Sequence, residues 1–352
     1  MKQTCLSAVL AVIFFSCSSI RSMEVETYNP AAITFPPEIR TVMIVNNAAQ
    51  QPDGLGHRYI RSRGDDSVMF VPADSAAYDF CLRLGESMAE SPVFQDVRIC
   101  DDTMRKDSVF YDKRPFSKDA VEILCDSYGV DALISLDHFV FLTEVRESEF
   151  AGFPPGKSIH VRLSGELRAL WPGQKEIYTF PFSDSLNWYR SEDLYFDSPV
   201  TPADVKYAMH YLSGVTGGKM HVNFVPYWST GNRWYYTSMS SEWKRGAVHA
   251  AAGKWEEAAA IWEPLLSGTG NWRSKACLLS NLALCREMTG DFEKATGYAA
   301  ECGRLFETYA GEDSDYTKLQ KRYLEVLNER AKNDAVLSGQ LRESPASGSA
   351  VH

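Results

Sequence analysis

Between residues 38 and 220 the apolar positions change back and forth between the spacing of strands and that of amphipathic helices. Residues 42–45 form an unbroken apolar run, which is typical of a strand buried on both faces. Residues 74–90 instead carry their apolar side chains on one helical stripe. The elements expected in this part are a strand at 42–45, a helix at 74–90, a strand at 97–100, a helix at 117–128 that Ser117 would cap, and a strand at 132–145.

Two antiparallel strands are expected next. From His160 to Trp171 apolar and polar residues alternate, which predicts a strand with one buried face and one wet face. Pro172 and Gly173 suit a turn, and aromatic residues alternate again along the return strand at 178–182. This pair would extend the sheet begun by the preceding strands.

A helix at 201–217 is predicted by its first residues. Thr201 suits the N-cap, Pro202 suits the first helical position, and Asp204 completes a capping box with Thr201. Together these elements predict a mixed sheet covered by helices.

A repeated helical pattern begins near residue 240. The segment GKWEEA at 253–258 recurs 37 residues later as GDFEKA at 290–295. Each glycine suits a sharp turn between two helices, and each aromatic residue and alanine suit the face that packs back on the preceding helix. The pattern resembles the tetratricopeptide repeat, whose period is about 34 residues. The resemblance covers residues 240–306 and implies a stack of helical hairpins.

The expected fold class is therefore α+β, with a mixed α/β sandwich domain followed by an all-α tetratricopeptide-like domain. Residues 315–330 have helical spacing and suit a terminal capping helix, whereas the polar residues after them suit a disordered tail. The expected domains are an α/β domain at 38–220, an aromatic interdomain segment at 221–239, a helical domain at 240–330 and a tail at 331–352.

The first residues of the chain predict export. A basic residue, Lys2, precedes a short apolar run that is too short to span a bilayer, so residues 1–16 suit a signal peptide. Cys17 follows that run directly and is the candidate for lipidation. Residues 17–37, rich in small residues and proline, suit a tether. An uncleaved anchor, or an ordinary signal peptide in which Cys17 is incidental, is the alternative.

Composition and charge exclude some classes of function. The chain has 352 residues, 45% of them apolar, which is enough for about two cored domains. Its net charge of −10 argues against a nucleic-acid partner, because phosphates require a basic face. The six cysteines after Cys17 form no C-x-x-C pair, so we expect buried free thiols, no metal site and no cofactor.

Three sequence segments carry a resemblance to a known family. They are PPEIRTVMIVNN at 36–47, DALISL at 131–136 and VPYW at 225–228. With Cys17, they make nearly the whole mature chain similar to an uncharacterised family of Bacteroidales lipoproteins. That resemblance implies an outer-membrane location but no activity. The strand and helix order of residues 38–217 also looks like the N-terminal domains of envelope assembly lipoproteins such as the curli secretion lipoprotein, which is a likeness of topology alone.

Two places along the chain suggest chemistry or binding. Asp137 and His138 are an acid–base pair inside an apolar strand, although a hydrogen-bonded core histidine is the more ordinary interpretation. Aromatic residues also crowd the segment before the repeats, where Arg233, Trp234 and Tyr236 are the candidate partner-binding residues. The alternative is that these rings fill the seam between two domains.

These observations predict a non-enzymatic envelope lipoprotein that binds a partner protein or peptide. The membrane would be reached through the lipid anchor. Two alternatives stay open: a glycan-binding lipoprotein that stacks sugars on exposed rings, and a hydrolase that uses Asp137 and His138.

The lipid anchor has a direct test. Replacing Cys17 with alanine should abolish fatty-acid labelling, because the thiol is the group that is acylated, and should leave both domains folded. Labelling is measured with a radioactive or clickable fatty acid, and folding by circular dichroism. Persistent labelling of the Cys17→Ala chain would place the anchor elsewhere.

Overall fold

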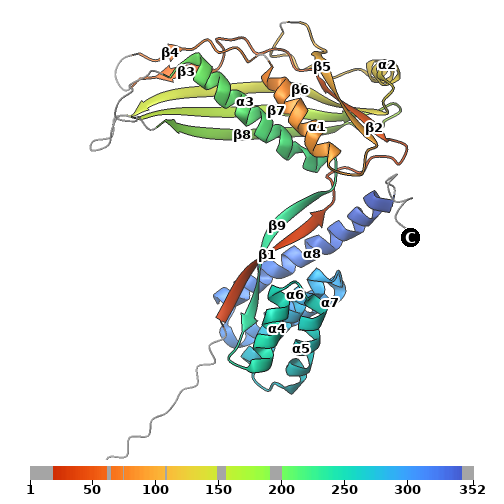
Figure 1. Ribbon diagram of the computed structural model, residues 1–352, viewed down its shortest axis with the longest axis vertical. Helices are drawn as coiled ribbons and strands as arrows, with labels where there is room; N and C mark the ends of the chain where they lie inside the picture. Colours follow the sequence, from red (N-terminus) through yellow and green to blue (C-terminus); the bar gives the residue numbers. More distant parts are fainter. Residues whose placement is uncertain are drawn as a thin grey trace, which may run out of the picture. The chain divides into compact units, whose positions relative to one another are not determined.

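The computed structural model describes residues 19–61, 65–73, 75–107, 109–148, 156–190 and 200–342. The chain divides into two compact units (Figure 1). One unit comprises Asn29–Tyr227 and Leu337–His352 and contains a large sheet. The other comprises Met1–Tyr28 and Trp228–Val336 and is mainly helical. The fold class is α+β, as expected, with a strand-rich part followed by a run of helices.

The sheet unit is organised around one long strand, β6. Strand β2 lies between β5 and β6 and runs parallel to both, whereas β6, β7 and β8 form an antiparallel series. Strand β3 pairs with the later part of β6, and β4 pairs with β3. The strands are β2 (Thr41–Asn46), β3 (His57–Ile60), β4 (Ser67–Val68), β5 (Asp96–Thr103), β6 (Ala132–Ser148), β7 (Gly156–Leu170) and β8 (Tyr178–Arg190).

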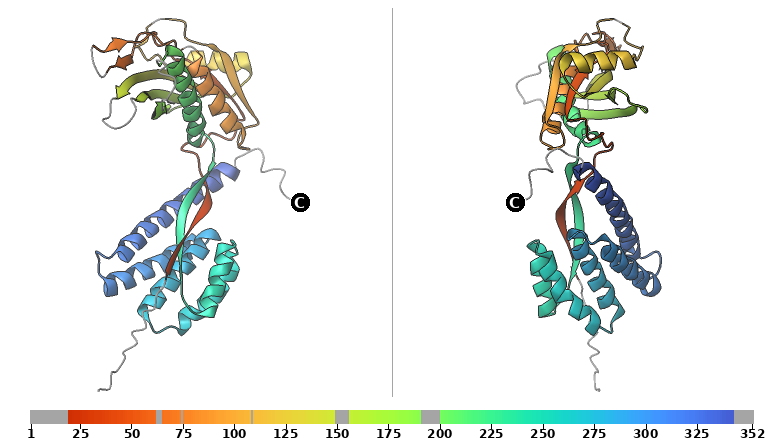
Figure 2. Two further views of the ribbon diagram at one scale, coloured as in Figure 1. Left: turned by 60° about the vertical axis from the view of Figure 1, so that its left-hand side comes forward. Right: turned by 90° about the vertical axis from the view of Figure 1, so that its right-hand side faces the viewer.

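Helices cover the two faces of this sheet unequally. Helices α1 (Ala76–Ala89) and α3 (Pro202–Lys219) pack on one face, and α2 (Lys118–Tyr128) packs on the other near β2 (Figure 2). Strand β2 is buried on both faces because Val42 and Ile44 face the first core while Met43 and Val45 face the second. The solvent face of β7 stays polar, as its alternation predicts.

Local sequence signals for these helices are confirmed. The hydroxyl of Ser117 accepts a hydrogen bond from the backbone N–H of Ala120 at 3.2 Å. Thr201 and Asp204 form the predicted reciprocal capping box, with Pro202 at the start of α3. Both caps satisfy N–H groups that the helix itself leaves without partners.

Helices α1 and α3 approach each other unusually closely at Gly217. A Cβ atom at this position would lie 2.2 Å from the carbonyl oxygen of Phe80. Only glycine allows that contact, because real Cβ atoms do not come so near to backbone oxygen. The outer neighbour Gly218 has space, since its Cβ would lie 3.6 Å from Ser87 Oγ. The contact sets the separation of the two helices.

The described part of the helical unit contains a two-stranded sheet and five helices. Strand β1 pairs with β9, and Thr27 Oγ1 lies 3.1 Å from Ser229 Oγ across that pair. A short 3₁₀ segment, Met220–Asn223, precedes β9 in the chain. The elements are β1 (Ser19–Asn29), β9 (Tyr227–Thr237), α4 (Ser241–Ala251), α5 (Trp255–Gly268), α6 (Trp272–Met288), α7 (Phe292–Ala310) and α8 (Asp315–Arg342).

The repeated segments form the turns of two helical hairpins. Gly253 joins α4 to α5 with a φ of 71°, and Gly290 joins α6 to α7 with a φ of 79°. These left-handed values are the reason for glycine at both positions. Ala258 and Ala295 are fully buried at equivalent places, so the 37-residue spacing reflects a repeated structural unit.

Three boundary predictions need correction. Residues 19–29, expected within a tether, form strand β1, because Val25 and Thr27 find a buried surface that the local composition does not reveal. The interdomain segment is largely strand β9. Residues 331–342, expected in a disordered tail, continue α8, where Leu337 and Gln340 are buried. The signal peptide, Cys17 and residues 343–352 lie outside the described residues.

Gly217 offers a test of the α1–α3 packing. The Gly217→Ala change should lower the free energy of unfolding of the sheet unit by about 1–3 kcal/mol, because the added methyl group forces the helices apart. The matched change Gly218→Ala, one residue away on the same helix, should be neutral or slightly stabilising. Urea unfolding followed by circular dichroism measures both. Equal effects of the two changes would contradict this account.

Candidate functional site

The aromatic segment chosen from the sequence lies in the core of the helical unit. Tyr236 is fully buried, and its backbone N–H donates to Asn281 Oδ1 at 2.7 Å. Asn281 Nδ2 donates in turn to the Tyr236 carbonyl at 2.8 Å. Trp243 Nε1 donates to the same carbonyl at 2.6 Å. Side chains of α4 and α6 thus form hydrogen bonds with the backbone N–H and carbonyl of this part of β9.

Arg233 lies in a buried ion pair. Its Nε and Nη2 atoms donate to the carboxylate of Glu287 on α6 at 2.7–3.0 Å. Tyr323 Oη donates to the same carboxylate at 2.7 Å, and Arg330 Nη1 also donates to it. Burial alone would raise the pKa of Glu287, but these donors and charges outweigh burial and lower it. The cluster joins β9, α6 and α8.

Trp234 is the most accessible of the three predicted binding residues, and it too packs inward. Its ring lies 5.2 Å from the ring of Tyr323, edge to face. Arg233 and Tyr236 are buried, so they are not accessible to a partner. Their contacts stabilise the helical unit instead. The structure places all three predicted residues against helices α6–α8. A surface that binds a partner must therefore be formed by other side chains, which are exposed.

The Asp137–His138 pair is also built into structure. Asp137 sits at an irregularity in the β6–β7 register and is fully buried. Its carboxylate accepts hydrogen bonds from Arg168 Nη1 at 2.8 Å, Asn47 Nδ2 at 2.7 Å and Ser135 Oγ at 2.6 Å. Burial raises the pKa of Asp137, although these donors act in the opposite direction. Asn47 also donates to the carbonyl of Arg114, so the carboxylate anchors a neighbouring loop.

His138 faces a different environment from Asp137. Its ring lies 6.3 Å from Phe110, and burial together with Lys113 lowers its pKa, so the imidazole is neutral near pH 7. The nearby hydroxyl of Ser135 is committed to Asp137. Among the described residues, the nucleophile–histidine–acid arrangement of a hydrolase with a serine nucleophile is therefore not assembled around His138.

Among the described residues, three exposed aromatic side chains that contact one another lie on α3 and the end of β8. Tyr207 and Tyr211 are one helical turn apart and are 62% and 53% exposed. The ring of Trp188 packs edge to face on both, with centroids 5.3 and 6.2 Å away. Val215 continues the same stripe. Tyr and Trp clustered on a surface are the residue types that most often carry binding energy at protein interfaces.

A groove between α1 and α3 adjoins this stripe. It has a volume of about 440 Å³ and is lined by Asp79, Leu82, Arg83, His210, Tyr211 and Val215, among others. The two helices run side by side in the same direction, because Asp79 meets His210 while Ser87 lies near Gly218 further along. Figure 1 shows them together on one face of the sheet.

Polar groups line the floor of this groove. Asp79 Oδ2 lies 2.5 Å from His210 Nδ1, and His210 Nε2 has no hydrogen-bond partner within the described part of the chain. Arg83 pairs with Glu86 at 2.7 Å, but its guanidinium stays exposed. We call Tyr207, Tyr211, Val215, Trp188 and Arg83 the α3 surface. It combines apolar rings with one accessible cation, and both kinds of group can contact a peptide.

The α3 surface was missed by the sequence reasoning, although it left a signal. In the helix at 201–217, Val205, Ala208, Met209 and Leu212 form the buried stripe. Tyr207, Tyr211 and Val215 form a second apolar stripe on the opposite side, where a helix that only covers a sheet normally carries polar residues. That second stripe is the signal.

Another cavity, of about 420 Å³, lies at the carboxyl ends of the parallel strands β2 and β5. Ligands of open α/β sheets often bind at such an edge. One of its charged side chains is already engaged, because Arg105 donates to Asp107 and to the carbonyls of Val109 and Asp112. The rest of the lining combines alanines and amides with one acidic and one basic side chain, Asp102 and Lys106, and this mixture does not define one chemical class of ligand.

The described residues form no metal centre, no reactive thiol site and no membrane-spanning helix. Within the described ranges, no group of three His, Cys, Asp or Glu side chains is placed to hold a metal ion. The six described cysteines are free, and burial raises the pKa of Cys81 to about 12 and that of Cys125 to about 11. Such thiols are unreactive packing groups at neutral pH. None of the described helices is long and apolar enough to cross a bilayer.

Comparison with known proteins yields two family matches. A family model described as Domain of unknown function (DUF8603) matches residues 39–236. A second, described as Domain of unknown function (DUF6340), matches residues 244–329. No curated protein matches the chain. One solved structure, described as "Crystal structure of uncharacterized protein", is 12% identical over 53% of this chain and 94% of its own, with a TM-score of 0.23.

The Glu287 cluster predicts a stability effect at Arg233. The Arg233→Ala change should lower the free energy of unfolding of the helical unit by about 3–5 kcal/mol, because it leaves Glu287 buried with fewer partners. Replacing the exposed Trp228 with alanine serves as the control and should cost far less. Urea unfolding measures both. If the Arg233→Ala chain were as stable as the unchanged chain but no longer bound a partner, Arg233 would be a partner-binding residue after all.

The same cluster predicts an acid dependence of stability. The pKa of Glu287 is lower in the folded chain than its ordinary value of 4.5. Its contribution is therefore complete above about pH 4.5 and is lost as the pH falls through the lowered folded pKa. In Glu287→Gln this part of the acid destabilisation should disappear. Thermal unfolding between pH 3 and 7 compares the two chains, and identical slopes would contradict the assignment.

Proposed function

The chain belongs to the family described as Domain of unknown function (DUF8603), and from that premise we propose that it is a non-enzymatic cell-envelope lipoprotein that binds a partner protein or peptide. The observation that carries this proposal is the α3 surface. Two tyrosines and a tryptophan stay exposed there beside a groove. Apolar groups that stay exposed beside a groove are typical of interaction surfaces.

The arrangement of the rings favours a peptide over a sugar. Trp188 meets both tyrosines edge to face, at interplanar angles of 62° and 68°. Rings packed in this way present edges and corners, whereas a sugar stacks on a flat, open ring face. An apolar peptide side chain can insert between such rings, and a carboxylate of the peptide would pair with Arg83.

The location belongs to the same proposal. Lipidation at Cys17 would anchor the chain to the outer membrane, in keeping with the resemblance to Bacteroidales lipoproteins. The tetratricopeptide-like interpretation of residues 240–306 is supported by the two hairpins with positive-φ glycines at a 37-residue spacing. Repeats of that kind bind extended or helical segments of other proteins, and the helical unit could therefore add a second contact.

One observation favours the glycan-binding alternative. Trp228 on β9 is 67% exposed, with its ring 4.9 Å from that of Tyr28. An exposed indole can stack on a sugar ring. This candidate uses a single ring, so we rank it second.

The proposed binding surface can be tested in cells with a photo-crosslinking amino acid. Placed at Tyr211, it should capture a defined partner protein. Placed at the exposed Tyr111, which lies outside the α3 surface, it should not. With the photo-crosslinking amino acid moved to the neighbouring Val215, the double change Tyr207→Ala and Tyr211→Ala should reduce partner recovery by about tenfold or more, as loss of two interface tyrosines normally does. Undiminished recovery, or capture of soluble glycans that depends on Trp228, would overturn the proposal.

A further inference from the structure

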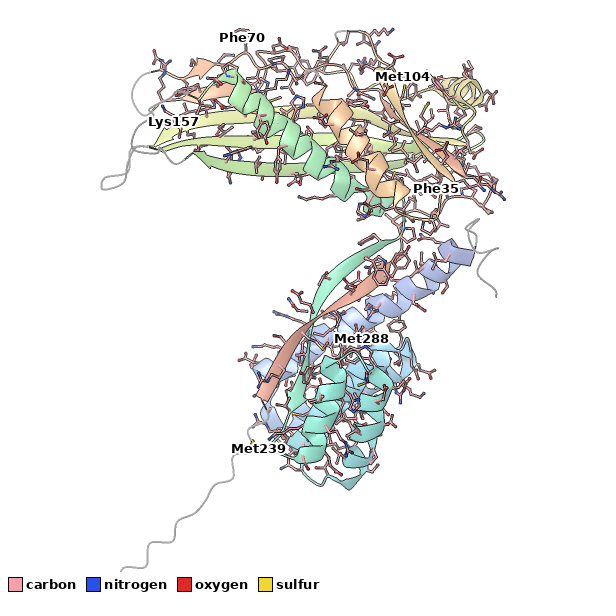
Figure 3. The ribbon with its side chains drawn as sticks, in the orientation of Figure 1. Phe35, Phe70, Met104, Lys157, Met239 and Met288 are labelled. Carbon is pink, nitrogen blue, oxygen red and sulfur yellow. The ribbon has the colours of Figure 1, made fainter. Side chains whose placement is uncertain are left out.

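One exposed patch of the helical unit lies close in the chain to the proposed lipid anchor. It is formed by Arg21 near the start of β1, Met239 after β9, and Lys244 and Val248 on α4, and it surrounds a depression of about 420 Å³. We call these four residues the anchor-proximal patch. Figure 3 labels Met239 beside the beginning of β1.

The patch is unusually apolar for an exposed surface. Met239 is 80% exposed and Val248 is 68% exposed, which makes them two of the most accessible large apolar side chains described. Lys244 and Val248 are one helical turn apart, so α4 presents both on one side. Water-exposed apolar side chains at this density are expected where a surface meets an apolar partner.

The charge of the patch has one sign. Arg21 and Lys244 are the charged residues that line the depression, and no acidic residue lines it. Neither cation forms an ion pair with any other described residue. In a chain whose net charge is −10, a surface with two unpaired cations and no acid is complementary to an anionic partner.

The position of Cys17 selects that partner. Arg21 follows Cys17 by four positions, and an extended chain of that length spans at most roughly 14 Å. A lipid on Cys17 would therefore keep Arg21 near the headgroup layer.

We infer that the anchor-proximal patch rests against the anionic headgroups of the membrane that carries the anchor, with Met239 and Val248 dipping into the interface. The inference depends on the proposed lipidation of Cys17. It adds an orientation: the end of the β1–β9 pair and one side of α4 would face the bilayer, and each cation would strengthen the contact about fivefold.

The experiment uses the lipidated full chain, reconstituted into vesicles of phosphatidylethanolamine and phosphatidylglycerol. A polarity-sensitive fluorophore is attached to the thiol that Met239→Cys introduces, in a chain in which the half-buried Cys100 carries the change Cys100→Ser. Emission should shift to shorter wavelength and be quenched by spin labels carried on the lipid. The same fluorophore at the exposed Tyr309, outside the patch, should show neither effect.

The double change Arg21→Glu and Lys244→Glu should reverse the shift and weaken binding of the unlipidated chain to the same vesicles by more than tenfold. Flotation of the vesicles separates the two hypotheses. A chain that floats but has a water-exposed fluorophore at position 239 overturns the patch and leaves the anchor intact. A chain that does not float overturns the anchor, and the inference fails with it.

Discussion

A single buried carboxylate, that of Glu287, governs the helical unit. It accepts hydrogen bonds from Arg233 on β9 and from Tyr323 and Arg330 on α8, while its own backbone belongs to α6. A carboxylate without these partners would be very costly to bury, so the three elements can close around it only together. Strand β9 then holds β1, and the hairpins complete the unit around Tyr236 and Phe306.

The sheet unit depends on a different constraint, the close approach of α1 and α3. Gly217 places the α3 backbone against Phe80, whose ring enters the core between Phe139 and Phe182. The buried side of α3 is occupied by that packing, and its outer side carries Tyr207 and Tyr211 into solvent. Helix α3 has two apolar stripes, and only one of them packs on the sheet. The other stripe stays exposed and forms the proposed binding surface.

Local signals in the sequence predicted much of the sheet unit. Ser117, Thr201 and Asp204 marked helix starts correctly because a cap depends on residues three positions apart. The strand at 42–45 could be predicted because it is buried on both faces and therefore contains no polar residue. Strands β3 and β4 were missed because a four-residue and a two-residue strand carry too little periodicity, and their pairing depends on distant β6.

The sequence by itself determined the α+β class, the order of the main elements and the glycine-hinged hairpins, because each rests on periodicity or on φ values that neighbouring residues impose. Tertiary structure alone decided the roles of the charged and aromatic side chains. Arg233 resembled a binding residue until Glu287, more than fifty positions away, was placed against it. Tyr211 resembled part of an ordinary helix until the core was found to occupy the other side. Burial depends on contacts between distant parts of the chain, and a local pattern does not contain them.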